Sequence, residues 1–197
     1  MDLSVAQRFE GKWILAKNAD AYIVPRINLF EFKDNTLILS DTENILRTSD
    51  CRIVGNGIFV EDNLFGNFKF LNDNRFALCK YDDKDASRNL ELDFVRLQAT
   101  ETSLTEAEIE ELTFENKELD LLIGFNVELQ KPFLLALLKE KASRKMLLKR
   151  IDSTLLICNY NADELESIIP IKEVGKEFIE IYGFSRKEPY SLRINRI

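Results

Sequence analysis

The chain has 197 residues, 45% of them hydrophobic and 31% charged, and a formal net charge of −7. This length can bury the core of one or two domains without disulfides or metals, and the composition is that of a soluble globular protein. The negative charge argues against nucleic acid and against an anionic membrane surface as partners, because both require a basic protein surface.

Cysteine usage and hydropathy bear on the compartment. Cys51, Cys79 and Cys158 are widely spaced and odd in number, which fits reduced, buried side chains better than a disulfide framework. Residues 1–20 contain no apolar stretch of the kind found in signal peptides. The longest purely apolar run, residues 133–138, is too short to span a bilayer. We therefore expect a cytoplasmic protein without a membrane span.

The first half of the chain alternates between apolar and polar residues, which predicts short strands. Asp34-Asn35 and Gly55-Asn56-Gly57 are turn signals between such segments, since these residues accept positive φ angles. The pattern predicts an antiparallel meander or barrel of roughly eight strands. The strands are expected near residues 13–16, 28–33, 36–39, 51–54, 58–60, 68–71, 75–79 and 90–97.

The composition changes after Thr100. Residues 101–120 carry eight acidic side chains against one basic one, and Thr105 lies where it can cap a short helix. Residues 131–150 carry seven basic side chains, and Pro132 begins a pattern typical of a helix, with apolar residues on one face through Met146. Strands follow near residues 146–151, 154–158, 176–182 and 190–197. We expect a β-barrel domain over residues 1–100 and an α+β domain over residues 101–197, so that the whole chain is mainly β with some α.

Two weak repeats relate the halves. Residues 34–39 are similar to residues 152–157, and the alternation Leu90-Leu92-Phe94-Arg96 is similar to Tyr190-Leu192-Ile194-Arg196. Such repeats leave two alternatives open, a degenerate second copy of the first domain or an unrelated second half.

The motif Phe9-x-Gly11-x-Trp13 at the first strand resembles the opening of the calycins, the superfamily of lipocalins and fatty-acid-binding proteins. The last predicted strand of this half, which ends in Phe94-Val95-Arg96-Leu97, resembles the closing strand of those barrels. The resemblance covers residues 5–98 and implies that Arg96 stacks on Trp13 as a structural pair that closes the barrel. It also implies an apolar ligand.

Few residues suit chemical catalysis. The chain contains no histidine, which removes histidine-dependent nucleophilic sites, histidine general bases and most transition-metal sites. Gly55-Asn56-Gly57 is not a dinucleotide fingerprint, because Val60 stands where a third glycine belongs. Residues 83–94 lack the glycine and the glutamate of a calcium loop. We expect no enzyme activity, no metal site and no cofactor.

Aromatic residues dominate the predicted strands of the first half. Strand alternation can place them in rows that face the barrel interior, and such rows suit a small apolar ligand. The candidate ligand-binding residues are Phe30, Phe32, Phe68, Phe70, Phe76 and Phe94. The alternative function is that of an inhibitor or immunity-type protein whose acidic residues 101–120 dock on a basic protein partner.

Overall fold

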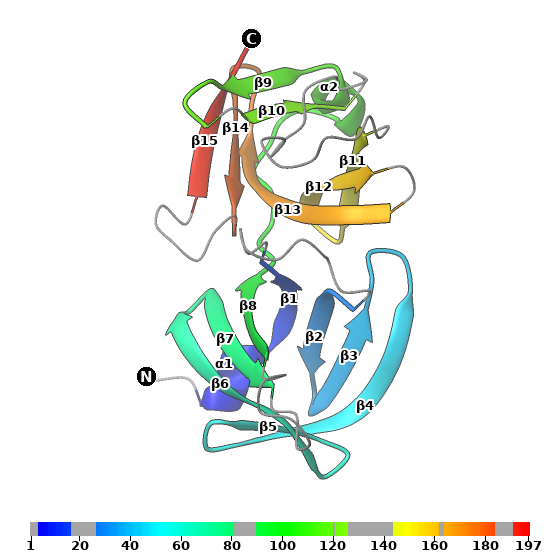
Figure 1. The fold of residues 1–197 in the computed structure, drawn as a ribbon, viewed down its shortest axis with the longest axis vertical. Helices are drawn as coiled ribbons and strands as arrows, with labels where there is room; N and C mark the ends of the chain where they lie inside the picture. Colours follow the sequence, from blue (N-terminus) through cyan, green and yellow to red (C-terminus); the bar gives the residue numbers. More distant parts are fainter. Residues whose placement is uncertain are drawn as a thin grey trace. The chain divides into compact units, whose positions relative to one another are not determined.

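The computed structural model describes residues 4–16, 27–80, 90–119, 121–125, 144–161, 164–183 and 191–197. These residues form fifteen strands and two short helices. They divide into two compact units (Figure 1), the first ending at Leu97 and the second continuing from Gln98. Within this described part, no helix is long and apolar enough to cross a membrane.

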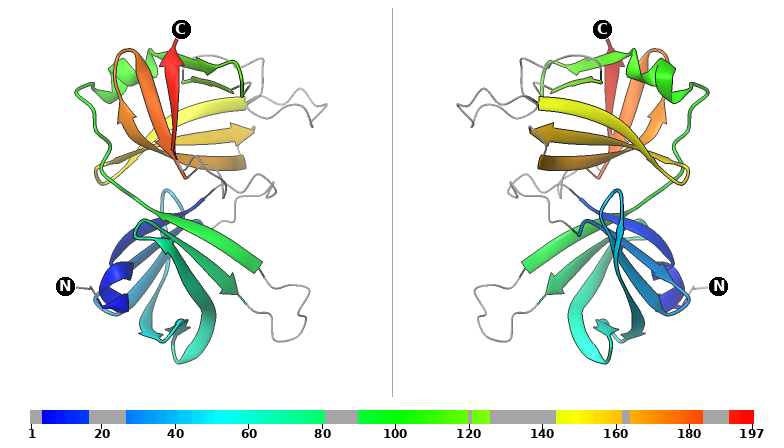
Figure 2. Two further views of the ribbon diagram at one scale, coloured as in Figure 1. Left: turned by 90° about the vertical axis from the view of Figure 1, so that its left-hand side faces the viewer. Right: turned by 90° about the vertical axis from the view of Figure 1, so that its right-hand side faces the viewer.

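The first unit is a closed antiparallel barrel, as the alternation predicted. Each strand pairs with the next along the chain, and the last strand pairs with the first. A short helix, α1 (Val5–Phe9), precedes the barrel and lies at one of its ends (Figure 2). The strands are β1 (Gly11–Leu15), β2 (Leu29–Lys33), β3 (Thr36–Ser40), β4 (Ile45–Val54), β5 (Gly57–Val60), β6 (Asn63–Asn72), β7 (Arg75–Lys80) and β8 (Leu90–Arg96).

The second unit is a curled antiparallel sheet with the strand order β10-β9-β15-β14-β13-β12-β11. One short helix, α2 (Glu106–Glu110), precedes it, and its first turn is acidic as predicted. Its strands are β9 (Thr113–Asn116), β10 (Leu121–Gly124), β11 (Arg144–Ile151), β12 (Thr154–Asn161), β13 (Glu164–Val174), β14 (Phe178–Tyr182) and β15 (Ser191–Arg196).

The α+β expectation for the second half is confirmed in part. Its described residues form antiparallel strands and the one short helix α2, so strands predominate there. The helix expected from Pro132 through Met146 was wrong in its last part, because residues 144–146 belong to β11, whereas the strand expected over residues 146–151 is confirmed. Met146 and Leu148 are buried there while Lys145 and Leu147 are exposed, so this segment follows the period-two pattern of a strand. The rest of the expected helix lies outside the described residues.

The two units share a strand order. Listed from the second strand backwards, the first barrel reads β2-β1-β8-β7-β6-β5-β4, which matches the order of the second sheet strand by strand. Of the strands of the first barrel, β3 alone has no counterpart among the described residues of the second unit. Each unit also begins with a five-residue helix stabilised by a capping box, built on Ser4 in α1 and on Thr105 in α2.

The closing strands match in register as well. Trp13 lies opposite Arg96 in the first unit, and Phe114 lies opposite Arg196 in the second. One residue further on, the N–H of Leu97 donates to the carbonyl of Lys12, and the N–H of Ile197 donates to that of Thr113.

Only one of the two sequence repeats falls on strands that are equivalent in this shared order. The repeat that ends at Arg96 and Arg196 falls on equivalent strands, β8 and β15. The repeat of residues 34–39 and 152–157 does not, since it relates the β2–β3 hairpin to the β11–β12 hairpin. The shared order is what duplication of one unit would produce, and duplication stays a prediction.

The two cores differ in chemistry. The first is rich in aromatic side chains, and Phe9 of α1 is fully buried within it. The second is mostly aliphatic, with Phe114 as the one aromatic residue among its described buried members. A barrel of eight strands encloses a space that side chains fill or that holds one small ligand. How the aromatic rings are distributed along the first barrel therefore bears on its function.

We expect Phe9→Ala to lower the free energy of unfolding by about 3–5 kcal/mol, because it empties a buried aromatic site. Urea unfolding would measure the loss. Val5→Ala in the same helix serves as the control, since Val5 is 42% exposed and its truncation should change stability by less than about 0.5 kcal/mol. Equal losses in both variants would show that the Phe9 ring does not support the barrel.

Candidate functional site

All six candidate phenylalanines lie on the inner face of the first barrel, in one cluster with Phe9 and Trp13. Four of them, Phe30, Phe32, Phe76 and Phe94, are buried. Phe68 and Phe70 are half-buried. The structure thus brings the predicted set together, and the rings are distributed between the two ends of the barrel.

The end next to α1 is filled by aromatic rings. The ring centroid of Phe9 lies 4.9 Å from that of Phe32, 4.6 Å from that of Phe68 and 4.8 Å from that of Phe70. Phe76 follows at 5.0 Å. These distances are those of direct ring contact. At this end the candidate residues therefore contact Phe9. The motif around Phe9 did not predict that its ring would fill the end of the barrel.

Arg96 closes this end from β8. Its guanidinium lies 4.2 Å from the centroid of the Trp13 ring, on the residue that it faces across the β1–β8 pair. The indole Nε1 of Trp13 in turn donates to the carbonyl of Phe9 (2.7 Å). The stacked pair implied by the calycin resemblance is thus present as a contact.

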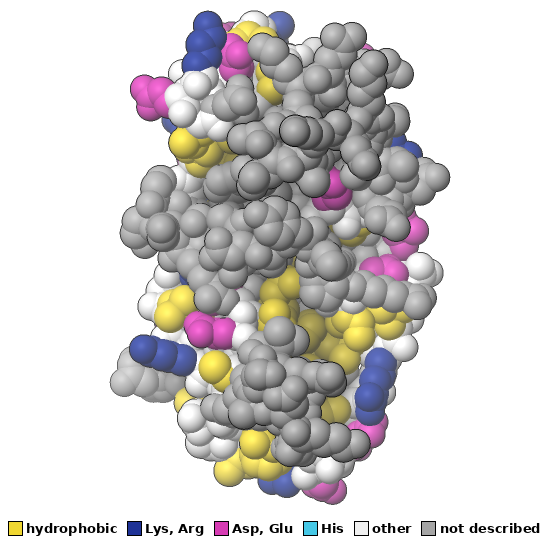
Figure 3. All heavy atoms as spheres, viewed as in Figure 1, with side chains coloured by type: hydrophobic (Ala, Val, Ile, Leu, Met, Phe, Trp, Pro, Cys, Tyr) yellow, Lys and Arg dark blue, Asp and Glu magenta, His cyan; other side chains and the backbone are white. Residues whose placement is uncertain are grey.

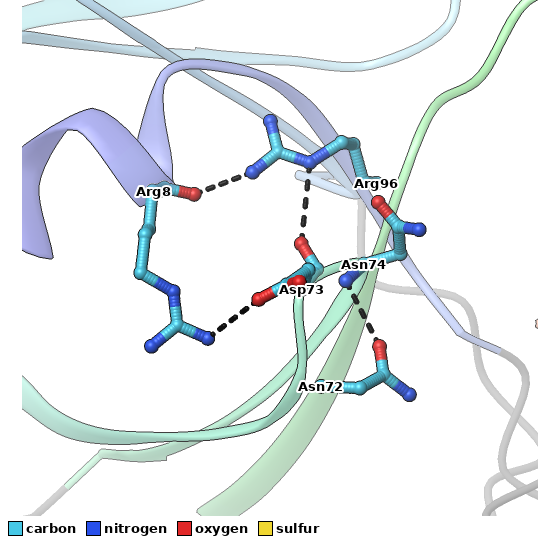
Figure 4. A network of polar contacts seen from close by, with 5 residues as sticks. All are labelled: Arg8, Asn72, Asp73, Asn74 and Arg96. Atoms are coloured by element: carbon cyan, nitrogen blue, oxygen red, sulfur yellow. Dashed lines mark hydrogen bonds and ion pairs between the residues drawn. The ribbon is translucent and has the colours of Figure 1, made fainter. Parts of the chain in front are cut away.

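The same guanidinium also holds backbone carbonyls (Figure 4). It donates to the carbonyls of Arg8 and Glu10 at the end of α1, and its Nε lies 3.5 Å from the carbonyl of Asp73. The side chain of Arg8 forms an ion pair with Asp73 (3.0 Å). Burial lowers the pKa of Arg96, and the nearby charge of Asp73 opposes that shift. Arg96 thereby joins α1, β1, β8 and the β6–β7 turn.

Gly11 permits this close approach. Its φ is +106°, which side chains rarely adopt, and a Cβ at this position would lie 3.3 Å from Nη1 of Arg96. The glycine of the Phe9-x-Gly11-x-Trp13 motif is therefore explained by backbone conformation and by space for the guanidinium.

The opposite end of the barrel, which we call the mouth, differs. β1 runs away from α1, so Leu15 lies farther from the helix than Trp13 does on the same strand. β8 runs towards α1, so Leu92 lies farther from it than Phe94 does. Both leucines are only half-buried, as is Phe65, and all three pack against the aromatic cluster. Figure 3 shows hydrophobic side chains gathered on the face of the first barrel that is turned to the viewer.

Two aromatic rings form the floor of the mouth. The ring of Phe30 lies 4.4 Å from that of Phe94 and 5.9 Å from that of Phe65. Phe94 stacks in turn on Phe76, at 5.0 Å and an interplanar angle of 11°. Phe30 and Phe94 are thus the candidate residues that lie next to the half-buried side chains of the mouth, whereas the half-buried Phe68 and Phe70 lie at the end next to α1.

One polar cluster lies on the same inner face. Arg47 donates from Nε to Ser49 Oγ (2.9 Å) and from Nη2 to Glu61 Oε2 (2.8 Å). Ser49 donates from Oγ to Glu61 Oε1 (2.8 Å). The hydrogen bond from Arg47, followed by that from Ser49, lowers the pKa of Glu61. Nothing in the sequence marks this cluster, because Arg47 and Ser49 lie on β4 and Glu61 lies in the β5–β6 turn, twelve residues after Ser49.

A small hollow beside α1 does not suit a ligand. It is lined by Phe9, Phe32, Cys51 and Ile53 among others, and its volume is about 30 Å³. Typical ligand pockets measure roughly 300–1,000 Å³. Burial raises the pKa of the Cys51 thiol to about 11, so Cys51 is protonated at neutral pH and is a poor nucleophile.

Several members of the acidic block 101–120 are engaged within the second unit. Glu106 forms an ion pair with Arg150 (2.6 Å), and Glu108 accepts hydrogen bonds from Thr105 at the start of α2. Asp120 lies outside the described residues. Across the described part of the chain, no group of three or more Cys, Asp or Glu side chains is placed to hold a metal ion.

Comparison with known proteins gives no match, whether to a protein family, to a curated protein or to a solved structure.

We expect Trp13 and Arg96 to be energetically coupled. Trp13→Ala should cost about 3–5 kcal/mol of unfolding free energy, and Arg96→Ala about 2–3 kcal/mol, because it removes the ring contact and the hydrogen bonds to the carbonyls of Arg8 and Glu10. A double-mutant cycle in urea should show that the two losses overlap by about 1 kcal/mol or more. Arg96→Lys should not restore stability, since an ammonium cannot stack on the indole and hold the carbonyls as a planar guanidinium does.

Arg52 provides the control for this cycle. Its guanidinium lies 4.6 Å from the Phe59 ring, but its side chain is exposed, so Arg52→Ala should cost less than about 1 kcal/mol. Strict additivity of the Trp13 and Arg96 losses would contradict a shared closing contact.

Glu61 should titrate with a lowered pKa, because Arg47 and Ser49 donate hydrogen bonds to its carboxylate. Because the pKa of folded Glu61 lies below its ordinary value of 4.5, the stabilisation from ionised Glu61 is present above that pH and is lost as the pH falls through the folded pKa. NMR titration of the Glu61 carboxyl should show the lowered pKa, and Arg47→Gln should move it back towards 4.5. The lowered pKa of Glu108 arises from Thr105 and should not move. A Glu61 pKa that is unaffected by Arg47→Gln would contradict the described hydrogen bonds.

Proposed function

We propose that the first barrel binds a small apolar ligand without converting it, and that the ligand enters at the mouth. The observation that carries the proposal is that, among the described residues, α1 and the Phe9 ring cover one end of the barrel and no helix covers the other. Phe68 and Phe70 are half-buried beside Phe9, whereas Leu15, Phe65 and Leu92 are half-buried at the end without a described helix. Half-exposed apolar side chains on a concave inner face are typical of a ligand site.

Phe30 and Phe94 would contact the ligand from the floor of the mouth, on the side of the barrel interior. Both rings are buried and belong to the same cluster as the leucines at the rim. In this proposal Phe32, Phe68, Phe70 and Phe76 support the floor, because they contact Phe9 on the side of α1. The candidate set therefore divides into residues that contact the ligand and residues that support them.

A binding role without catalysis fits the side chains available. The chain has no histidine, and the buried Cys51 thiol is protonated at neutral pH. The inner-face carboxylate at the mouth, Glu61, is neutralised by Arg47 rather than raised in pKa as a general acid would be. A calycin relationship, suggested by the motif around Trp13 and by its contact with Arg96, would be consistent with such a role.

The alternative, docking of a basic protein on the acidic block 101–120, has weaker support. Two of its carboxylates, Glu106 and Glu108, bind partners within the second unit. Their charge is then partly compensated and steers a basic partner less strongly.

We expect the protein to bind the neutral dye N-phenyl-1-naphthylamine with a rise in dye fluorescence. Leu92→Asp should weaken that binding at least tenfold, about 1.4 kcal/mol, because it introduces a charge among apolar side chains. Leu64→Asp is the matched control, since Leu64 is exposed, and it should bind the dye as the wild type does.

Thermal unfolding of both variants would verify that the barrel is intact. A wild-type protein that gives no fluorescence rise, or equal binding by the two variants, would contradict a ligand site at the mouth.

A further inference from the structure

The polar cluster Arg47–Ser49–Glu61 lies at the mouth. Arg47 pairs with Leu39 and Ser49 with Leu37 across the β3–β4 ladder, and cross-strand partners share one face of a sheet. Both leucines belong to the inner core. The same strand reaches α1 at Cys51 and Ile53. Arg47 lies four residues before Cys51, which is about 13 Å along the strand towards the mouth.

The cluster is neutral overall and accessible. One guanidinium and one carboxylate compensate each other through the 2.8 Å hydrogen bond of Arg47 to Glu61. Both side chains are 54% exposed, whereas Ser49 is buried. A guanidinium has five N–H donors and a carboxylate has about four acceptor positions, so the pair can still exchange hydrogen bonds with a ligand.

The backbone at Glu61 is unusual. Glu61 and Asp62 form the β5–β6 turn with φ angles of 49° and 66°. In the described part of the chain, Glu61 is the one non-glycine residue with positive φ that is neither Asp nor Asn. Glutamate tolerates this conformation less well than those residues do. Strain of this kind points to a role for the side chain that outweighs the cost to the turn.

We propose that Arg47, Ser49 and Glu61 recognise the polar end of the ligand and select a neutral hydroxyl-bearing ligand over a carboxylate. This inference rests on the proposed function. A ligand hydroxyl can donate to Glu61 and accept from Arg47, so it finds both partners in the existing cluster. A ligand carboxylate would compete with Glu61 for Arg47 and would be repelled by it, and such repulsion is an effective source of specificity.

The test compares decan-1-ol with decanoate as competitors of the bound dye at pH 7. These probes match in chain length and differ at the polar end. Decanol is also the more hydrophobic of the two, so the informative quantity is the change in their affinity ratio between variants. Glu61→Gln removes the negative charge and should shift the ratio at least fivefold towards decanoate, since Arg47 is then uncompensated.

Two further variants sharpen the test. Glu61→Asn should give the same shift, and asparagine suits the positive φ of the turn, so loss of folding cannot account for it. Asp62→Asn removes the same charge one residue away, but Asp62 pairs with Arg52 (3.4 Å) outside this cluster. Its ratio should equal that of the wild type.

The outcomes separate the two proposals. If the wild type binds no dye, the proposed function fails, and this inference fails with it. If the dye binds but the ratio is unchanged in both Glu61 variants, or shifts equally in Asp62→Asn, then only the selection by Glu61 is overturned.

Discussion

The first barrel depends on the guanidinium of Arg96. A sheet becomes a barrel only when its first and last strands pair, and Arg96 lies at that seam, on the ring of Trp13. It also donates to the carbonyls of Arg8 and Glu10, which end α1 and have no partners of their own within so short a helix. One side chain thus satisfies backbone acceptors at the end of the helix and covers an aromatic ring. Lysine could not do both.

Closure of one end determines what the other end can do. Once Phe9 fills the space beneath Arg96, its ring and its neighbours occupy the interior near α1. The half-buried side chains Leu15, Phe65 and Leu92 then remain at the mouth. An eight-stranded barrel has room for one small ligand or for side chains, and the proposed function would assign the two uses to opposite ends. In that proposal, the polar cluster of Arg47 would select among ligands at the mouth.

Local patterns predicted the strands of the first half, and the parity of residues 90–96 put Arg96 on the same face as Phe94. Its contact with Trp13 was implied by the calycin resemblance, not by the strand pattern. The position of the Phe9 ring could not be predicted, since it depends on where a five-residue helix meets the finished barrel. The cluster of Arg47 and Glu61 was equally hidden, because its partners meet across a hairpin and nothing in their spacing marks them. In the second half, Met146 fitted both a helical and a strand period, and its burial in β11 follows the strand period.

The second unit shows how far chemistry can change on an unchanged strand order. Where the first barrel has the buried ion pair of Arg75 and Asp93 (2.9 Å), the equivalent positions of β14 and β15 hold Phe178 and Arg193, stacked at 3.4 Å. Removal of one partner from a buried ion pair leaves an unpaired charge, whereas an aromatic ring needs no such partner. The aliphatic core of the second unit likewise lacks the described aromatic floor that supports the mouth of the first. A common topology therefore does not imply a common ligand, because function follows the side chains placed on it.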